Sequence, residues 1–337
     1  MHKLLRDLIQ KIDDFGAAGG LVQFTTLIPS FVDIAFSSQN IICSDGSDGD
    51  IVLDGGEGII PGFDKSGSGS SAIYTMTNHL TCSNLTISSG IELKPAGYLF
   101  RVRENMTLGD NCKITANGAN GSGASLGAGS TGNYYGGGTS GGTGRTDNGI
   151  DGGNATSFTS PYVYLGGNGG AGGNGASGNT GGTSVTTNKW AETNGDKFYA
   201  LLHSFAVNSV TELTKLAGGM GGGGGGGHNV ASSIDISGGG GGGGGVIVIM
   251  VGGKITYGTG CSIEAKGGNG ANATTETTAN LGGGGGAGGG CVIVRSKVKA
   301  GSVTITVTGG TAGTKTGTGT DGTAGVDGFS REVYFVG

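Results

Sequence analysis

Three long runs of glycine dominate this sequence. The first reads GGMGGGGGGG over residues 218–227, the second GGGGGGGG over residues 238–245, and the third GGGGGAGGG over residues 282–290. Glycine loses more backbone freedom on ordering than any other residue, so an isolated run of this kind behaves as a flexible linker. The second and third runs, however, lead directly into apolar, strand-like segments, VIVIMV from Val246 and CVIV from Cys291. A linker has no reason to recur in that position, and we therefore expect the runs to be packed structure.

The composition narrows the possible classes of protein. Glycine accounts for 82 of the 337 residues, whereas 13% are charged and only 4 are proline. Collagen needs glycine at every third position with abundant proline, and a disordered chain carries more charge and fewer apolar residues than the 34% found here. An ordered, repetitive, glycine-rich β protein is the class that remains.

Charge and hydropathy exclude two kinds of partner. The net charge is −5 and Lys and Arg are not concentrated anywhere, so we expect no nucleic-acid binding. No apolar run approaches the roughly 20 residues of a membrane span, so we expect no membrane insertion. The first residues are charged throughout and lack a small-residue cleavage site, which predicts no secretory signal and assembly inside a cell.

The five cysteines indicate packing rather than chemistry. Their number is odd, and no two have the CxxC spacing of a zinc site or a redox pair. We therefore predict reduced thiols that fill small apolar sites. They are Cys43, Cys82, Cys112, Cys261 and Cys291.

Residues 1–20 form the first predicted region, an amphipathic helix of about four turns. Its apolar stripe contains Leu4, Leu5, Leu8, Ile9 and Ile12. A helix this short is marginal alone, so we expect the stripe to pack on a partner. That partner is either the rest of the same domain, or a second copy or larger assembly, which would make the helix an attachment or oligomerisation element.

Residues 21–71 are predicted to form a small β region. Within it the stretch SDGSDGD places several carboxylates close together on a glycine-containing loop. Such an arrangement suits Ca²⁺ and makes Asp45, Asp48 and Asp50 candidate ligands. The alternative is a set of polar turns, in which Asp-Gly pairs are common.

An internal repeat organises residues 72–123 and 246–337. Short strand-like segments follow one another at even intervals in both regions. The segment MTLGDNCKITANGANG at residues 106–121 shares half of its sixteen residues with ITYGTGCSIEAKGGNG from Ile255, and residues 300–313 are a shorter third copy. Repeated strands of this kind predict an all-β fold, either a β-solenoid or a β-sandwich.

The alignment of the copies extends upstream to the glycine runs. VIVI from Val246 aligns with CVIV from Cys291, because both segments follow a run directly. In the third copy Val303 or Thr304 replaces the cysteine found at Cys112 and Cys261. A position that accepts valine is a packing position, so these thiols are predicted to be buried.

Residues 124–245 form a glycine-rich array that contains a non-repetitive insert at residues 183–216. A phosphate-binding loop would need GxxxxGK[ST] ahead of a helix, and these runs lead into strands instead. We predict a bundle of polyglycine II helices, which have three residues per turn and rise about 3.1 Å per residue. Helices without side chains can approach closely and bond to neighbours on all sides, provided that a stiff frame such as the β repeats orders them.

Aromatic residues in and beside the array are candidate contacts for a sugar or a protein surface. They are Tyr134, Tyr135, Phe158, Tyr162, Tyr164 and Trp190. Loops at the tips of the bundle are the expected place for such contacts. The alternative is packing, and the insert segment FYALLHSFAV also fits a helix that packs Phe198, Leu201, Leu202 and Phe205 onto the scaffold.

The sequence predicts neither an enzyme nor a cofactor site. The four histidines lack metal-ligand spacing, and no GxSxG motif or activated cysteine is present. A pair of carboxylates that cleaves a glycosidic bond leaves no local motif, so that one alternative stays open.

The order of these segments resembles a known class of proteins. DGDIVLDG, the strands from Tyr74, and the array that ends GGGGGGVIVIMVGGKITYGTGCSIEAKGGNG are together similar to glycine-rich fibre and tail proteins of tailed bacteriophages, over residues 48–337. The glycine runs alone resemble the polyglycine-sandwich tip adhesins of some contractile-tailed phages. The resemblance implies a symmetric virion appendage, with a homotrimer favoured, that binds other virion proteins and a host surface glycan or outer-membrane protein.

Three functions are therefore carried forward. The first is a non-enzymatic tail fibre or receptor-binding adhesin of the virion, assembled in the host cytoplasm. The second is a head fibre or capsid decoration protein that binds no receptor. The third is a cellular glycine-rich surface or ice-binding protein.

Overall fold

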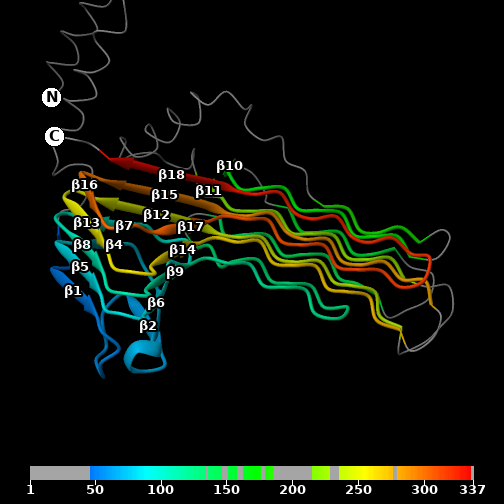
Figure 1. The fold of residues 1–337 in the computed structure, drawn as a ribbon, viewed down its shortest axis with the longest axis horizontal. Helices are drawn as coiled ribbons and strands as arrows, with labels where there is room; N and C mark the ends of the chain where they lie inside the picture. Colours follow the sequence, from blue (N-terminus) through cyan, green and yellow to red (C-terminus); the bar gives the residue numbers. More distant parts are fainter. Residues whose placement is uncertain are drawn as a thin grey trace, which may run out of the picture. The chain divides into compact units, whose positions relative to one another are not determined.

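Strands and extended glycine-rich segments make up the described part of the chain (Figure 1). The computed structural model describes residues 46–133, 136–145, 151–157, 162–175, 179–184, 215–227, 235–275 and 279–334. All of them belong to one unit, Cys43–Gly337. Within these ranges the only helical element is a single 3-10 turn, Gly69–Ser71, so the prediction of an all-β fold is confirmed. The helix predicted for residues 1–20 lies outside the described residues.

Three sheets contain most of the strands, and we name them A, B and C. Sheet A has the order β1 (Asp50–Leu53), β5 (Asn84–Ile87), β8 (Met106–Leu108), β13 (Lys254–Tyr257), β16 (Val298–Ala300). Sheet B has the order β2 (Phe63–Ser66), β3 (Ile73–Met76), β6 (Glu92–Lys94), β9 (Lys113–Thr115), β14 (Ser262–Glu264), β17 (Thr304–Thr306). Sheet C has the order β4 (Leu80–Cys82), β7 (Phe100–Val102), β12 (Val246–Val251), β15 (Cys291–Ser296), β18 (Phe329–Tyr334). A separate ribbon pairs β10 (Tyr162–Tyr164) with β11 (Lys215–Ala217).

Successive stretches of chain visit the three sheets in the same order. The chain passes from sheet C to sheet A to sheet B in β4, β5 and β6, and repeats this path in β7 to β9, β12 to β14 and β15 to β17. Strands from successive passes pair in parallel, whereas β2 and β3 pair antiparallel. The two repeat regions of the sequence therefore contribute to the same three sheets.

The register of the strands confirms the internal repeat. Ile255 lies opposite Met106, and Val246 lies opposite Cys291, as the alignment of the sequence copies predicts. In the third copy Thr304 lies opposite Ser262. Parallel neighbours present equivalent residues side by side, so a repeated sequence is what such stacking requires.

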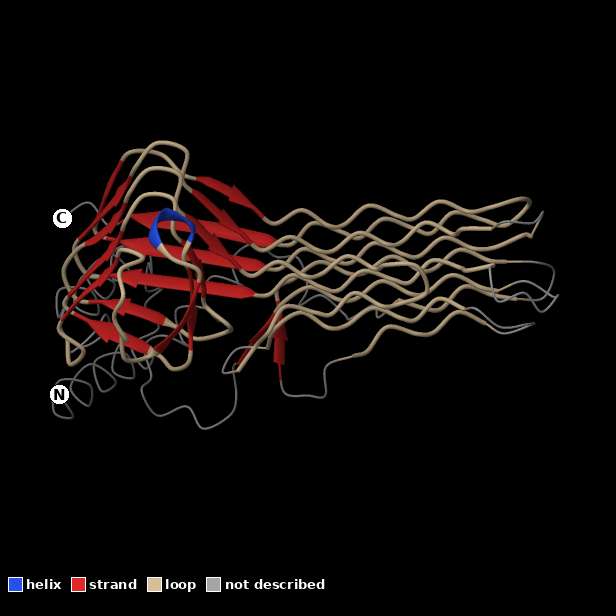
Figure 2. Ribbon diagram, turned by 90° about the horizontal axis from the view of Figure 1, so that it is seen from below, coloured by secondary structure: helices blue, strands red, loops and turns tan. Residues whose placement is uncertain are grey.

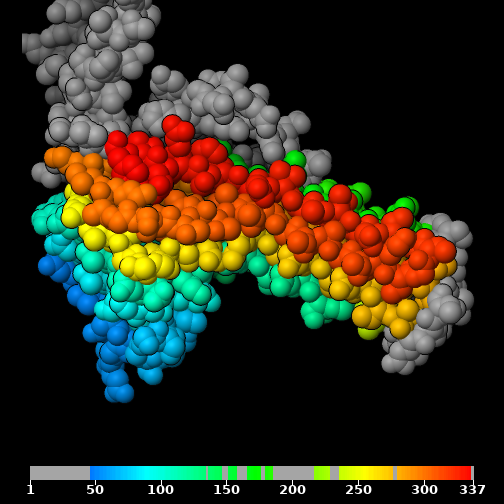
Figure 3. All heavy atoms as spheres, viewed as in Figure 1, coloured from blue at the N-terminus to red at the C-terminus, as the bar shows by residue number. Residues whose placement is uncertain are grey.

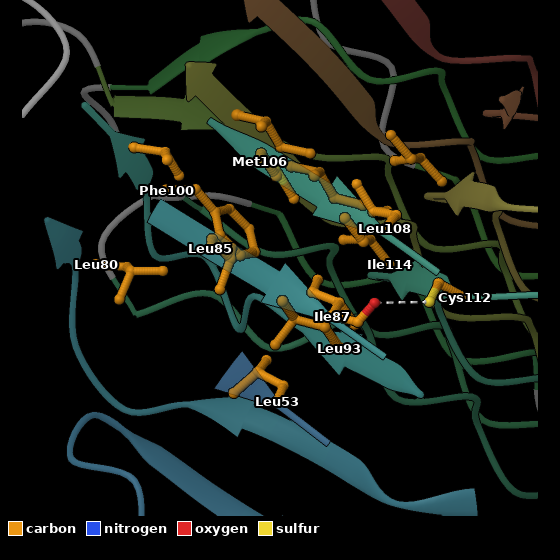
Figure 4. Close-up of a cluster of buried hydrophobic side chains, with 14 of the residues drawn as sticks. Leu53, Leu80, Leu85, Ile87, Leu93, Phe100, Met106, Leu108, Cys112 and Ile114 are labelled. Atoms are coloured by element: carbon orange, nitrogen blue, oxygen red, sulfur yellow. Dashed lines mark hydrogen bonds between the residues drawn. The ribbon is translucent and has the colours of Figure 1, made fainter. Parts of the chain in front are cut away.

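The hydrophobic core lies between the three sheets (Figure 4). Strand residues alternate between the inside and the outside, as in β5, where Leu85 and Ile87 are fully buried. Aliphatic side chains from successive strands stack on one another, as do Leu85 and Met106. The packing buries large apolar side chains from every sheet, including Leu53, Phe100, Leu93, Leu108 and Ile114.

Four cysteines are buried with free thiols, as predicted. Cys82, Cys112 and Cys261 belong to the core between the sheets, whereas Cys291 lies outside that cluster. The Cys112 sulfur donates to the Ser88 carbonyl oxygen at 3.0 Å. Burial raises the pKa of Cys82 to about 12 and that of Cys112 to about 11, so both stay protonated thiols at neutral pH. Cys43 lies outside the described residues.

A charged pair covers the core at the end formed by β16 and β18. Lys299 lies opposite the buried Ile255, at a position that points inward. Its Nζ atom is 3.0 Å from the Glu332 carboxylate and lies over the rings of Tyr257 and Tyr334, 5.6 and 5.3 Å from their centroids. At the edge formed by β16 and β18, a half-buried ion pair and aromatic rings thus cover the core, whereas Ile305 of β17 keeps an aliphatic side chain against it.

The glycine-rich segments extend from the sheets as a bundle of parallel and antiparallel runs (Figure 2). We call this the glycine bundle and define it as residues 116–133, 136–145, 151–157, 165–175, 179–184, 218–227, 235–245, 265–275, 279–290 and 307–328. Hydrogen bonds from one run to a given neighbour recur at every third residue. Three such bonds join Gly219 to Gly244, Gly222 to Gly241, and Gly225 to Gly238. The next residues of the same run bond to another neighbour, in the pairs Met220 to Gly167, Gly223 to Gly170, and Gly226 to Gly173.

Position in the bundle decides which runs consist almost entirely of glycine. Residues 218–227, 238–245 and 282–290 are buried along their whole length, because other runs surround them. The run at residues 166–175 reads GGNGGAGGNG, and every third position of it is partly or fully exposed. In this run the side chains thus occur at the partly or fully exposed positions, whereas the buried runs contain only two, Met220 and Ala287.

Asparagine side chains on the exposed runs of the bundle accept backbone N–H groups of the neighbouring run. Asn120 Oδ1 accepts the Asn269 N–H at 2.8 Å, and Asn269 Oδ1 accepts the Thr311 N–H at 2.9 Å. Asn272 repeats this contact with Thr314. These side chains satisfy backbone donors at the edge, where no further run is present to accept them.

We expect acid to weaken the corner that His79 occupies. His79 Nδ1 accepts the Leu99 N–H at 3.1 Å, and partial burial, assisted by the Arg101 charge, lowers the pKa of His79 from its usual 6.5. The unfolded chain therefore takes up this proton more readily, so the stabilisation is complete above about pH 6.5 and is lost as the pH falls through the lowered pKa. The free energy of unfolding, measured by urea denaturation, should fall between pH 7.5 and pH 5 by about 1 kcal/mol more in the wild type than in His79→Gln, which is the contribution of one hydrogen bond. An equal difference in both proteins would contradict this assignment.

Candidate functional site

A polar groove lies where sheet B meets the glycine bundle, and we call it the elbow groove. Its volume is about 310 Å³. Sheet B forms one wall, and the first run of the bundle with its returning partner forms the other; the surface is hollowed between these two parts (Figure 3). The lining residues are Thr75, Glu92, Lys94, Ala96, Thr115, Ala116, Asn117, Ala119, Ala128, Gly129, Ser130 and Thr131.

A carboxylate and an ammonium group supply the charges of the elbow groove. Both belong to β6 and point outward, because the intervening Leu93 points into the core. Thr115 Oγ1 donates to Glu92 Oε1 at 2.5 Å, and Lys94 Nζ lies 3.9 Å from the same oxygen. Glu92 therefore keeps its second oxygen available as an acceptor, and the Lys94 side chain, 45% exposed, is a donor within reach of a ligand.

A second carboxylate, Glu264, lies beside the groove. Asn117 Nδ2 donates to its Oε2 at 3.3 Å, and Lys266 Nζ lies 2.6 Å from the same atom. Partial burial acts to raise the pKa of Glu264, but hydrogen bonds from Lys266, Asn117 and Ser262 outweigh it and lower the pKa overall. A glycosidase needs a general acid whose pKa is raised, so this carboxylate does not fit that role.

Methyl groups line part of the elbow groove and complement its polar atoms. Ala96, Ala116, Ala119 and Ala128 contribute them, while Thr75 and Thr131 add hydroxyl groups. A pyranose ring presents hydroxyls at its rim and C–H groups on its faces, and the groove offers partners for both. Its volume lies at the lower end of the range for small-molecule sites, about 300 to 1,000 Å³.

The acidic stretch predicted as a calcium site makes hydrogen bonds within the protein. Asp48 Oδ2 accepts the Thr81 N–H at 2.8 Å, and Asp50 Oδ1 accepts Asn84 Nδ2 at 3.0 Å. Asp45 lies outside the described residues. In the described ranges, no three Asp, Glu, His or Cys side chains gather as a metal site would require. Asp48 and Asp50 act here as caps between neighbouring strands.

The predicted aromatic contacts are placed only in part. The backbone of Tyr162 and Tyr164 forms β10 and pairs with β11. Outside the described residues lie Tyr134, Tyr135, Phe158 and Trp190, as do the apolar residues proposed for attachment, Leu4, Leu5, Leu8, Ile9 and Ile12.

The ends of the insert differ from the expected position at the tip of the bundle. Thr183 lies partway along the bundle, where its N–H donates to Asn154 Oδ1 at 2.9 Å. Lys215 opens β11, and Gly219 just beyond it donates to Gly244, next to the start of β12. The described ends of the insert thus leave the side of the bundle and return at the sheets.

Sequence reasoning did not identify the elbow groove. Its lining comes from four separate stretches of chain, and none of them carries a motif. The available signal was the alternation in β6, where Glu92 and Lys94 flank the apolar Leu93 and therefore share the outer face.

Comparison with known proteins returned no match for this chain among protein-family models, curated proteins or solved structures. Within the described ranges, no helix has the length and apolar character needed to cross a membrane.

Proposed function

We propose that this chain is a non-enzymatic structural protein of a phage virion, a tail fibre or receptor-binding adhesin that displays a host-contacting surface on a stiff scaffold. The observation that carries the proposal is the glycine bundle, in which buried runs bond to neighbours at every third residue. Such a rod has an interior made almost entirely of backbone, with few side chains such as Met220 and Ala287, and its surface is free to vary. That combination suits display rather than catalysis.

The bundle is best interpreted as polyglycine II, and the sheets as a short β-solenoid. Polyglycine II has three residues per turn, which agrees with bonds to one neighbour at every third residue. In a β-solenoid each turn adds one strand to each face, which agrees with the repeated path through sheets C, A and B. The solenoid turns hold the ends of the runs in register and so supply the stiff frame that ordered glycine needs.

We propose the elbow groove as the host-contacting site and a surface glycan as its ligand. Glu92 and Lys94 supply an acceptor and a donor for sugar hydroxyls, and Ala128 supplies an apolar wall. Attachment to other virion proteins is assigned to residues 1–20, and a homotrimer is the assembly that we propose.

A competition experiment tests the proposal. Purified chain, added before the phage that encodes it, is expected to reduce adsorption to host cells, because it occupies the receptor. Glu92→Ala combined with Lys94→Ala should weaken this competition by about tenfold or more, since two hydrogen-bonding partners are lost. Glu104→Ala, which removes an exposed carboxylate paired with Arg103 outside the groove, is the matched control and should compete like the wild type.

Antibody labelling of intact particles distinguishes the alternatives. Labels at the tail support the adhesin, whereas labels on the capsid without competition for adsorption would establish a head fibre or decoration protein. Absence of the chain from purified particles would overturn the virion assignment altogether.

A further inference from the structure

Two columns of inward-pointing side chains, one in sheet A and one in sheet C, end in charges of opposite sign. The column of sheet A consists of Ile51, Leu85, Met106, Ile255 and Lys299. The column of sheet C consists of Leu80, Phe100, Ile249, Val294 and Glu332. The first four members of each column are apolar and belong to the core between the sheets. The last member is charged in both columns, and the two charged side chains pair with each other.

The charged residues lie on the last strand of each sheet. Within the described part of the chain, β16 has a neighbouring strand on one side only, and so does β18 (Figure 1). β18 pairs with β15 along all six of its residues, whereas the other strands at the ends of sheets A, B and C have three or four residues. A long edge strand presents a row of backbone N–H and C=O groups to which another chain can pair. The edge formed by β16 and β18 is therefore the one that most needs protection from further strand pairing.

Water still reaches the charged pair at this edge. Lys299 Nζ donates to both carboxylate oxygens of Glu332, at 3.1 and 3.0 Å, and the Tyr334 hydroxyl donates to Oε1. The exposed fractions of the two charged side chains are 26% and 27%. Further strands on β16 and β18 would remove both groups from water. The hydration that an ion pair loses on burial often exceeds the attraction between its charges, so this addition would be unfavourable.

At the opposite end of the sheets, the same two columns begin with apolar residues, Ile51 of β1 and Leu80 of β4. Head-to-tail stacking of two copies would place the charged pair of one copy against these apolar side chains of the other. A head-to-tail contact does not close on itself and, where it is favourable, continues as a filament. One charged end is enough to prevent every contact of such a series.

We propose that the Lys299–Glu332 pair terminates the sheets and prevents a second copy of this chain from adding its strands to β16 and β18. The pair occupies two core positions, so the hydrophobic core cannot continue into a neighbouring molecule. This inference is independent of the proposed function, because it concerns how folded copies avoid one another whatever they bind. A homotrimer that assembles through other surfaces is compatible with it.

Replacing the pair with apolar residues is expected to make the protein associate. Lys299→Ile combined with Glu332→Val repeats in each column the residue that precedes the charged one. Apolar side chains in place of a partly buried ion pair are often neutral for stability, so the chain should still fold. In sedimentation velocity the weight-average mass of this variant should rise with protein concentration, by about twofold or more, whereas the wild type should keep one mass. A variant that keeps the wild-type mass would overturn the proposal.

Arg103→Ile combined with Glu104→Val is the matched control. It removes a pair of the same signs, 3.0 Å apart and 40% and 49% exposed, and adds the same apolar side chains. The pair follows β7, which is an interior strand of sheet C. The control should sediment like the wild type. Equal association of both variants would show that added apolar surface alone is responsible, and would contradict the assignment to the edge.

The Cys112 thiol distinguishes ordered association from unfolding, because it is buried in the core. Copies that associate while folded should keep Cys112 protected from a maleimide. If the apolar variant labels at Cys112, Lys299→Met combined with Glu332→Gln takes its place, since it removes both charges and keeps the length of both side chains. Association of this variant with Cys112 protected supports the proposal, and a mass equal to that of the wild type overturns it.

Discussion

Replacing Gly222 with alanine is expected to prevent the glycine bundle from assembling. The added Cβ would lie 2.1 Å from the Gly285 carbonyl oxygen and 2.5 Å from its carbon. Both are backbone atoms of a buried run, so neither can move without breaking hydrogen bonds on other sides. We expect a loss of about 4 kcal/mol or more, seen as a collapse of soluble yield and of the thermal unfolding midpoint.

Gly58→Ala is the matched control, because it is the same substitution at a glycine with no atom within 4 Å of its Cβ position and no positive φ. It should be neutral or stabilise slightly, by up to about 1 kcal/mol, since alanine has less freedom when unfolded. A soluble Gly222→Ala protein with an unchanged midpoint would show that residues 218–227 are a linker after all.

Phe100→Ala is expected to cost about 3 to 5 kcal/mol, because it removes a fully buried aromatic ring from the core between the sheets. Val298→Ala removes a side chain that is 47% exposed and should cost less than about 1 kcal/mol. Urea denaturation of the three proteins, followed by circular dichroism, measures both effects.

The same experiment tests whether sheets and bundle unfold together. Residues 238–245 run into β12 without an intervening loop, as do residues 282–290 into β15. Unfolding of the three sheets should therefore unfold the glycine bundle as well. Phe100→Ala should then lower the urea midpoint of a single cooperative transition. Two transitions, of which only the first moves, would show that the bundle stands alone.

Much of the architecture could be predicted from the sequence because both of its parts are periodic. Stacked parallel strands place equivalent residues of a repeat opposite one another. The alignment of Met106 with Ile255 therefore predicts that these two residues pair, as they do. Two of the glycine runs lead directly into strand segments, which argues against the interpretation of the runs as flexible linkers. The structure adds which runs are central: the three glycine-rich runs are buried along their whole length, whereas the run that contains Asn168, Ala171 and Asn174 is partly or fully exposed at those positions.

The elbow groove could not be predicted, because it depends on the angle between two periodic parts. Glu92 and Ser130 meet there only once the chain has left sheet B, turned and come back. Local sequence patterns contain no information about which residues of these two parts lie close together. The acidic stretch was ambiguous for a related reason: Asp48 and Asp50 have the spacing of ligands, yet hydrogen bonds to the neighbouring strand occupy them.

The three-residue period of the bundle also restricts how such an arm can change its length during evolution. Inserting one or two residues into a run would rotate every later position by a third or two thirds of a turn, and side chains such as Asn168 would then point at a neighbouring backbone. Inserting three preserves the phase but leaves a protruding turn of about 9 Å, unless adjacent runs gain three residues as well. Lengthening therefore has to occur in matched triplets across several distant parts of the gene. We expect homologous arms to differ in whole steps of about 9 Å, while the reversals between runs vary freely.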